Sequence, residues 1–223
     1  MIRLPKIIAL IFSIALHGSL MAQENVPKNF MIVIREAEGA EWPTIQLEPE
    51  YPQKAEIDGK IVDFNLAWFT LIGDTQLRFV LDDEASMTNV TVEEFERYGV
   101  STEQAIHTSI ENIERTYGVA QYSEWQRGIY VVKAGSDDLA SSHLLNRRFW
   151  ADVDTTYPDG VVAGIPDRAT LIFAPLEDQE ASQLLVGNLP QLKTGSGQNG
   201  ISDRAFIRVD GKWHLLSLGE EKE

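Results

Sequence analysis

Three short turns constrain the fold of this chain more than any other feature. Asp58-Gly59, Gly73-Asp74 and Asp210-Gly211 each lie between two runs that are rich in apolar residues. Two-residue turns of this kind are typical of β-hairpins, whose strands pair antiparallel. Parallel strands would need long crossover connections instead. The sequence therefore predicts sheets that are mainly antiparallel and built from hairpins.

Further strands are predicted where β-branched and aromatic residues cluster, at residues 29–35 and 128–134. The strands beside the first two turns are apolar at consecutive positions, which predicts that both of their faces are covered. Residues 160–174 read GVVAGIPDRATLIFA, two apolar runs separated by a polar insert. Pro166 suits the second position of a tight turn and Asp167 suits the third, so two buried strands are expected there.

Helices are predicted from capping signals. Thr91 with Glu94, and Ser101 with Gln104, each form the capping-box pattern at the start of a helix. Asp137-Asp138 is expected to cap a helix over residues 139–153, and Glu177, Asp178 and Glu180 lie at the start of a further helix that is expected to run to about Leu189. The predicted fold class is α+β: a mainly antiparallel sheet built from hairpins, with three to four packed helices. Residues 23–223 are expected to form a single domain, whose part 24–76 is rich in strands.

The first 22 residues have the order of a secretory signal peptide. Arg3 and Lys6 form a basic start, residues 7–16 are almost entirely apolar, and Ala22 supplies a small residue for cleavage. The alternative is a membrane anchor, but the apolar stretch is shorter than the ~20 residues that span a bilayer. We therefore expect export to the bacterial periplasm or secretion, and no stable membrane insertion after cleavage.

Charge and composition exclude several function classes. The 223-residue chain has 34 acidic and 19 basic residues, a formal charge of −15. Such a charge repels phosphate backbones and anionic lipids, so no nucleic-acid partner is expected. The chain has no cysteine, which excludes disulfides, a thiol nucleophile and cysteine-based metal sites.

Four segments in a fixed order resemble the YtpQ-like family, a bacterial domain of unknown function. They are VTVEEFERYGVSTEQAIHTSIENIERT, GIYVVKAGSDDLASSHLL, GVVAGIPDRATLIFA and the closing hairpin with its Asp-Gly turn. The resemblance covers roughly residues 77–218. It implies an α+β fold and no established activity, and it supplies no catalytic residues. The chain departs from the family in its predicted export and in residues 24–76, which have no clear counterpart.

The residues that suggest catalysis or metal binding have simpler explanations. Asp138, Ser141, Ser142 and His143 are the residue types of a serine hydrolase, but they follow one another along one predicted helix. His107 and Glu111 are spaced to share a metal or to form a surface ion pair, and we favour the pair. His214 is expected to be a half-buried structural residue. The sequence therefore predicts no catalytic residue, no metal site and no cofactor.

The strongest candidate site is basic. Arg147 and Arg148 are adjacent cations in an acidic chain, and Arg168 stands at the next predicted turn. If the helix packs on the hairpin, the three guanidinium groups can converge on a carboxylate or phosphate. The alternative is that each arginine pairs with a nearby acid.

Two functional hypotheses follow. The first is an exported, soluble, non-catalytic protein that binds an unknown protein or small molecule, helped by surface tryptophans such as Trp42 and Trp213. The second is a periplasmic hydrolase whose site assembles only in three dimensions. Whether the chain is an enzyme stays open at this point, although we favour a binding protein.

Overall fold

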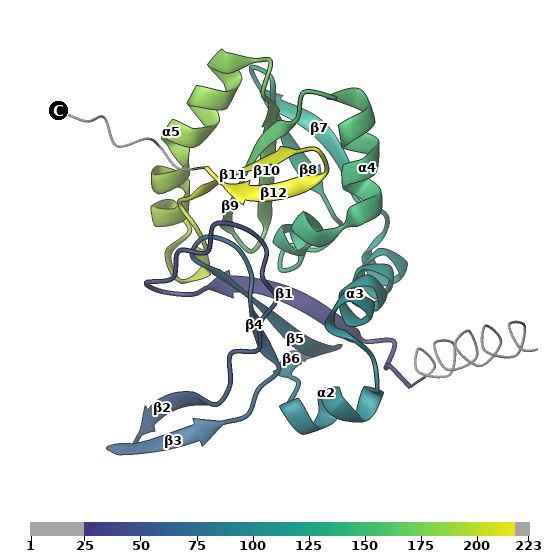
Figure 1. The fold of residues 1–223 in the computed structure, drawn as a ribbon, viewed down its shortest axis with the longest axis vertical. Helices are drawn as coiled ribbons and strands as arrows, with labels where there is room; N and C mark the ends of the chain where they lie inside the picture. Colours follow the sequence, from purple (N-terminus) through teal and green to yellow (C-terminus); the bar gives the residue numbers. More distant parts are fainter. Residues whose placement is uncertain (1–24, 217–223) are drawn as a thin grey trace, which may run out of the picture.

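Two antiparallel sheets, one from each half of the chain, carry the fold (Figure 1). The computed structural model describes residues 25–216, so the predicted signal peptide at residues 1–22 lies outside the described part. The α+β class, the antiparallel pairing and the number of helices agree with the prediction. Among residues 25–216, none of the helices combines the length and the apolar character needed to cross a bilayer.

The first sheet is packed against two helices. Its strand order is β1-β5-β4, with β6 also paired to β5. The bounds are β1 (Phe30–Glu36), β4 (Trp68–Thr70), β5 (Thr75–Asp83), β6 (Ser86–Asn89), α2 (Val92–Tyr98) and α3 (Thr102–Tyr117). Both helices begin with the predicted capping boxes, at Thr91 and Ser101. The apolar side of α3 then lies in a core with the buried residues of β1 and β5.

A hairpin of β2 (Gln53–Ile57) and β3 (Lys60–Phe64) projects from this half, away from both sheets (Figure 1). The turn at Asp58-Gly59 is as predicted, with positive φ at both residues. The expected cover on both faces is wrong here. Ile61 is 73% exposed and Ile57 is 48% exposed, because these two strands pair only with each other in the described part of the chain.

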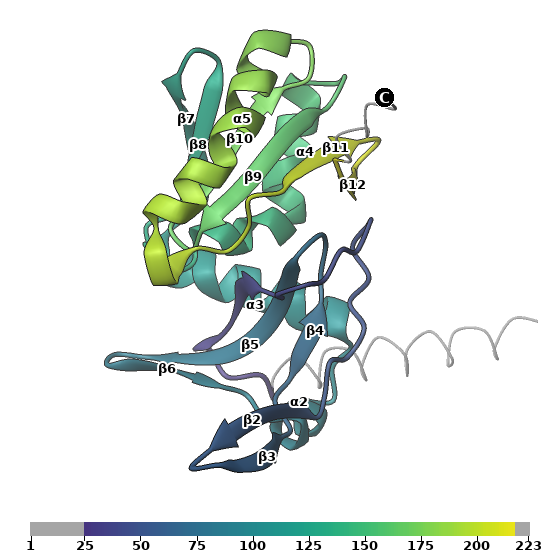
Figure 2. The same ribbon diagram turned by 90° about the vertical axis from the view of Figure 1, so that its left-hand side faces the viewer.

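The second sheet has six strands in the order β12-β11-β9-β10-β8-β7. The bounds are β7 (Gln121–Gln126), β8 (Ile129–Lys133), β9 (Val161–Asp167), β10 (Thr170–Pro175), β11 (Ala205–Val209) and β12 (Lys212–Leu215). Helix α4 (Arg147–Thr156) packs on one face and α5 (Gln179–Gly195) on the other (Figure 2). Two short 3-10 helices complete this half, η1 (Ala140–Leu145) and η2 (Gly197–Asn199). The result is a three-layer sandwich.

Alternation along the central strands explains the three layers. Ala163 and Phe173 belong to the core on the α4 side, whereas Val162 and Ile172 belong to the core on the α5 side. Successive side chains of a strand point to opposite faces, so a continuous apolar run is buried when both faces are covered. This explains why GVVAGIPDRATLIFA is apolar throughout its two strands.

Two local predictions in this half are wrong. The turn of GVVAGIPDRATLIFA is Arg168-Ala169, because Asp167 still pairs with Thr170 and Pro166 is buried within β9. The predicted helix over residues 139–153 is broken into η1 and α4 at Asn146. Asp138 does not cap η1, and its carboxylate pairs instead with Arg168 at 3.3 Å.

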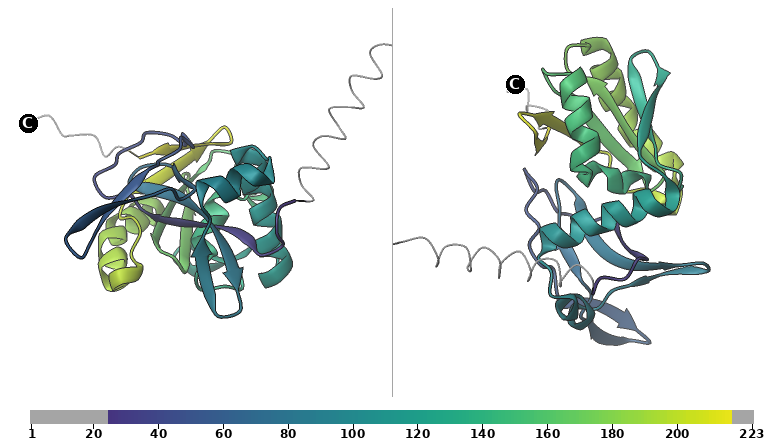
Figure 3. Two further views of the ribbon diagram at one scale, coloured as in Figure 1. Left: turned by 90° about the horizontal axis from the view of Figure 1, so that it is seen from below. Right: turned by 90° about the vertical axis from the view of Figure 1, so that its right-hand side faces the viewer.

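Helix α3 lies where the two halves meet (Figure 3). Ile34, Leu71 and Ile72 of the first half share a buried core with strands β9 and β10 of the second half. Pairing crosses the boundary as well, since the Leu215 N–H donates to the Pro43 carbonyl at 2.8 Å. The halves are thus joined by apolar packing and by backbone hydrogen bonds.

Candidate functional site

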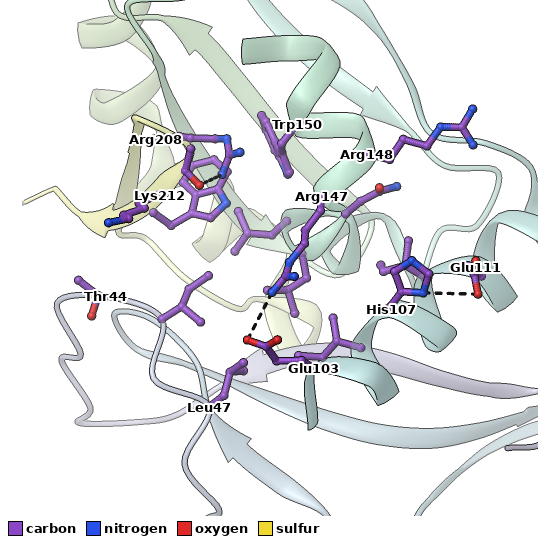
Figure 4. Close-up of a pocket in the computed structure, with 18 of the residues that line it drawn as sticks. Thr44, Leu47, Glu103, His107, Glu111, Arg147, Arg148, Trp150, Arg208 and Lys212 are labelled. Atoms are coloured by element: carbon purple, nitrogen blue, oxygen red, sulfur yellow. Dashed lines mark hydrogen bonds and ion pairs between the residues drawn. The ribbon is translucent and has the colours of Figure 1, made fainter. Parts of the chain in front are cut away.

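A groove of about 1170 Å³ opens between the two halves (Figure 4). Its first side is made by α3 and by the loop at residues 44–47. Its second side is made by the end of η1, the start of α4 and the β11–β12 turn. Since clefts between packed units are common ligand sites, this groove is the candidate functional site.

The lining of the groove includes many apolar residues. They come from the loop, α3, η1, α4 and β12: Ile45, Leu47, Ile106, Ile110, Leu144, Leu145, Trp150 and Trp213. Most of these side chains also belong to the two main cores, which fixes their positions. Trp213 is only 6% exposed, so the expectation of a surface tryptophan at this position is wrong. The floor of the groove is therefore a rigid apolar surface.

Helix α3 supplies an acidic wall. Glu103, Glu111 and Glu114 line the groove one to three turns apart, together with His107. His107 Nδ1 lies 3.5 Å from a Glu111 carboxylate oxygen, and both side chains are exposed, as expected for a surface pair. Within residues 25–216, no group of three or more His, Cys, Asp or Glu side chains is arranged to hold a metal ion.

The opposite wall is basic. Arg147, Arg148 and Lys212 line it, so two of the three predicted anion-binding residues lie in the groove. Arg147 reaches across to Glu103, with 3.5 Å between the guanidinium nitrogen and the carboxylate oxygen (Figure 4). Arg148 points away from Arg147, and it forms no ion pair with an acid of the described chain. Arg147 is therefore the cation that faces the groove.

The ion pair between Arg147 and Glu103 is easily exchanged. The two side chains are 81% and 68% exposed, and pairs this exposed contribute about 1 kcal/mol or less to stability. An anionic ligand can replace the Glu103 carboxylate at little cost. The ion pair also spans the groove from α4 to α3. When Arg147 and Glu103 separate, the space above the apolar floor becomes wider.

Arg208 lines the end of the groove, but its guanidinium group already forms an ion pair with Asp154. Its guanidinium group donates to both carboxylate oxygens of Asp154, at 2.9 and 2.8 Å, and to the Gly211 carbonyl at 2.8 Å. It also lies over the ring of Trp213, 5.5 Å from the centroid. Since this bidentate pair is largely buried, Arg208 holds the β11–β12 hairpin against α4.

Arg168 lies apart from the other two predicted residues. It pairs with Asp138 and with the Asn199 side chain, and it is not part of the lining of the groove. Its charge acts instead on Arg35 of β1. The pKa of Arg35 is lowered to about 10, mainly by burial and also by the neighbouring charges of Arg168 and Arg78. The structure thus brings Arg147 and Arg148 to one groove and places Arg168 with a second group of arginines.

The residue types of a serine hydrolase do not assemble into a triad here. Ser141, Ser142 and His143 have no exposed surface. The Ser142 hydroxyl donates to the Ile32 carbonyl at 2.8 Å, and His143 Nδ1 contacts the Asn146 amide at 3.1 Å. His214 is exposed on β12, so its expected half-burial is wrong. Ser142 and His143 therefore make structural hydrogen bonds, and the hydroxyl of Ser141 has no hydrogen-bond partner in the described chain.

Asn146 is the residue that sequence reasoning missed. It begins α4 by accepting the Phe149 N–H, and its Nδ2 donates to a carboxylate oxygen of Glu114 on α3 at 2.8 Å. It therefore links the two walls of the groove, α4 and α3, through a hydrogen bond. An Asn directly before a helical segment is a local capping signal, and Asp137-Asp138 obscured it because they also resemble a helix start.

Comparisons with protein-family models, with curated proteins and with solved structures found no match to this chain. The resemblance to the YtpQ-like family therefore stays a prediction.

Proposed function

We propose that this chain is an exported, non-catalytic binding protein whose groove holds an amphipathic ligand with an anionic group. The observation that carries the proposal is the composition of the groove. Its floor is apolar, and Arg147 lies beside that floor, paired in the described chain only with the exposed carboxylate of Glu103. An apolar body would lie on the floor and an anionic head would replace Glu103 on Arg147. Export is proposed from the sequence of residues 1–22.

The electrostatics support an anionic head group. The whole chain has a formal charge of −15, so most of its surface repels anions. In the groove, Arg147 and the other basic residues of its wall, Arg148 and Lys212, lie near the three glutamates of α3, and Arg147 is the one that faces the groove. The net repulsion of anions is therefore reduced in the groove, where the guanidinium group of Arg147 supplies a directional contact for an anion.

The test compares two dyes that share an apolar body. Anilinonaphthalene sulfonate has one anionic group, and phenylnaphthylamine has none. Both should bind the groove, the sulfonate more tightly, and both should quench the nearby Trp150 and Trp213. Charge reversal of Arg147 (Arg147→Glu) should weaken sulfonate binding about fivefold or more and change binding of the neutral dye by less than about twofold.

A floor variant and a surface control complete the experiment. Leu145→Gln should weaken both dyes, because it places an amide on the apolar floor. Lys133→Glu, an exposed charge reversal on β8, should affect neither. The protein is recovered from the periplasmic fraction, and its mass should match a chain that begins near residue 23. Dye binding unaffected by both groove variants would reject the groove, and recovery only from the cytoplasm with residues 1–22 intact would reject export.

A further inference from the structure

The β2–β3 hairpin has an edge and an apolar face that nothing in the described chain covers. Among the described residues it pairs with no other strand, and Ile57 and Val62 on one face are 48% and 38% exposed, while Ile61 on the opposite face is 73% exposed. It projects away from both sheets (Figures 1 and 2). A two-stranded hairpin alone is marginally stable in water, and a free edge is a template for pairing with another strand.

The base of the hairpin is held in place. The Gln53 side chain accepts the Leu66 N–H at 3.0 Å and donates to the Leu66 carbonyl at 3.2 Å, across the two ends of the hairpin. The strands pair in register from Gln53↔Phe64 to Ile57↔Lys60. The free edge therefore has a defined position relative to the body of the protein.

The register determines which backbone groups of β2 point outward. Ile57 and Lys60 close a two-residue turn, so they form a hydrogen-bonded pair. Hydrogen-bonded and non-hydrogen-bonded pairs alternate along antiparallel strands. The N–H and C=O groups of Lys54 and Glu56 therefore face away from β3, and these two residues form the free edge.

We propose that β2 pairs antiparallel with β2 of a second copy of this chain, about a twofold axis at residue 55. This register uses the outward backbone groups of Lys54 and Glu56 in both copies. It also places Lys54 directly opposite Glu56 of the second copy, and Glu56 opposite its Lys54. Opposite charges directly across a sheet are stabilising, so two ion pairs form around the axis.

Charge selects this register and this edge. An axis at Lys54 would place two lysines opposite each other, and an axis at Glu56 would place two glutamates there. Pairing through the outer edge of β3 about Val62 would set Ile61 against Asp63, with no matching charge. Of these registers, only the one about residue 55 of β2 sets opposite charges against each other across a symmetric interface.

The pairing also extends the apolar face of the hairpin over a larger sheet. Four strands in the order β3-β2-β2-β3 form one continuous sheet, and three or more strands with an apolar face are stable where two are not. Ile57, Val62 and Phe64 lie on the same face of the hairpin, because they occupy alternate and paired positions. A symmetric axis joins this face to the same face of the second copy.

Charge swaps test the proposal by sedimentation velocity on the protein expressed from its full sequence. The wild type should form dimers as concentration rises. Lys54→Glu places glutamates opposite each other, and Glu56→Lys places lysines opposite each other. Each single variant should raise the dimer dissociation constant about tenfold or more. The double variant Lys54→Glu/Glu56→Lys, and an equimolar mixture of the two single variants, should regain the wild-type constant.

The swapped pairs make the result specific to this register. Both side chains are exposed, so circular dichroism should show an unchanged fold in every variant. Lys133→Glu makes the same change of charge on another strand and should leave the dimer unaffected. A wild type that stays monomeric, a dimer that survives either single variant, or a mixture that fails to associate would each overturn the proposal. These outcomes are independent of dye binding in the groove.

Discussion

At the scale of the residue, Asn146 determines which tautomer of His143 is present, and burial keeps the imidazole neutral. The Phe149 N–H donates to Asn146 Oδ1, so Asn146 Nδ2 is the donor toward Glu114 and toward His143 Nδ1. His143 Nδ1 is therefore an acceptor, and the imidazole proton lies on Nε2. Nε2 has no hydrogen-bond partner, and burial lowers the pKa of His143 to about 4. His143 is neutral in the folded protein at neutral pH.

This state predicts a loss of stability in mild acid. The pKa of His143 is lower in the folded state than in the unfolded chain, so protons bind preferentially to the unfolded chain. The cost is absent above about pH 6.5 and grows as the pH falls toward 4, reaching about 3 kcal/mol. We expect the free energy of unfolding, measured by urea titration, to fall over this range.

The variant His143→Gln separates this contribution from that of the acidic residues. It should be less stable than the wild type at pH 7, because the buried imidazole packs well. Its stability should nevertheless fall less steeply between pH 6.5 and 4.5. His107→Gln, at an exposed position on α3, should keep the wild-type slope. Equal slopes for His143→Gln and the wild type would show that His143 is not buried as a neutral group.

Sequence reasoning succeeds for residues whose partners are close in the chain. Thr91 and Ser101 cap their helices as predicted, because each capping box closes within three residues. The partner of Asn146 on α3 is Glu114, 32 positions away. Nothing in the local sequence specifies that pairing, so the residue that joins the walls of the groove could not be identified in advance.

At the scale of the element, Gly164 sets the distance between β9 and α5. A Cβ atom at this position would lie 2.3 Å from Leu189 Cδ2 and 3.0 Å from its Cδ1. Leu189 is fully buried, so it has little room to move. A glycine inside a strand often marks a close approach of another element, and here Gly164 allows α5 to pack closely against β9.

Gly164→Ala should therefore destabilise the protein by about 1–3 kcal/mol through overpacking, measured by urea titration. The double variant Gly164→Ala/Leu189→Ala should cost less than the sum of the two single variants, because the shortened side chain makes room for the methyl group.

Gly187→Ala is the matched control on the same helix. Nothing lies within 4 Å of its Cβ position, and alanine favours a helix interior over glycine by about 0.5–1 kcal/mol. It should be neutral or stabilising. Additive effects at positions 164 and 189 would show that this close approach does not limit stability.

Elements with clear turn or cap signals were predictable, and those decided by distant partners were not. The hairpin predicted at Asp210-Gly211 forms, and it pairs Arg208 with Trp213 and Phe206 with Leu215. By contrast, Asp138 resembles a helix cap, but the carboxylate pairs with Arg168 of the β9–β10 turn instead. A strong local signal can thus be overridden by an ion pair that forms only in the folded chain.

At the scale of the whole molecule, the groove forms where the two halves pack against each other. Local sequence patterns do not predict how the halves are oriented. Its acidic wall comes from α3 in the first half and its basic wall from α4 and β12 in the second. The sequence indicated Arg147 and Arg148 as a basic pair, but it did not indicate the apolar floor beneath them. Contacts between the two halves therefore also maintain the geometry of the groove.

Lys193 of α5 is one such connection. Its ammonium group lies 2.6 Å from a Glu36 carboxylate oxygen and 3.7 Å from one of Asp74, both in the first half. Burial raises the pKa of Asp74, while a hydrogen bond from Ser202 and the charge of Lys193 act in the opposite direction. Lys193→Met should therefore cost about 1–3 kcal/mol of stability at pH 7, because it leaves the largely buried carboxylate of Asp74 without its cationic partner.

The pH dependence of this cost identifies its origin. Without Lys193 the pKa of Asp74 rises further, so Asp74 is protonated in the folded state as the pH falls, and the penalty for burying its charge disappears. The destabilisation by Lys193→Met, measured by urea titration, should therefore be smaller near pH 5 than at pH 7. Lys133→Met, which removes an exposed lysine without an ion pair in the described chain, should have little effect at either pH. If Lys193→Met destabilises the protein equally at pH 5 and pH 7, the loss of stability comes from lost packing of the Lys193 side chain and not from the charge of Asp74.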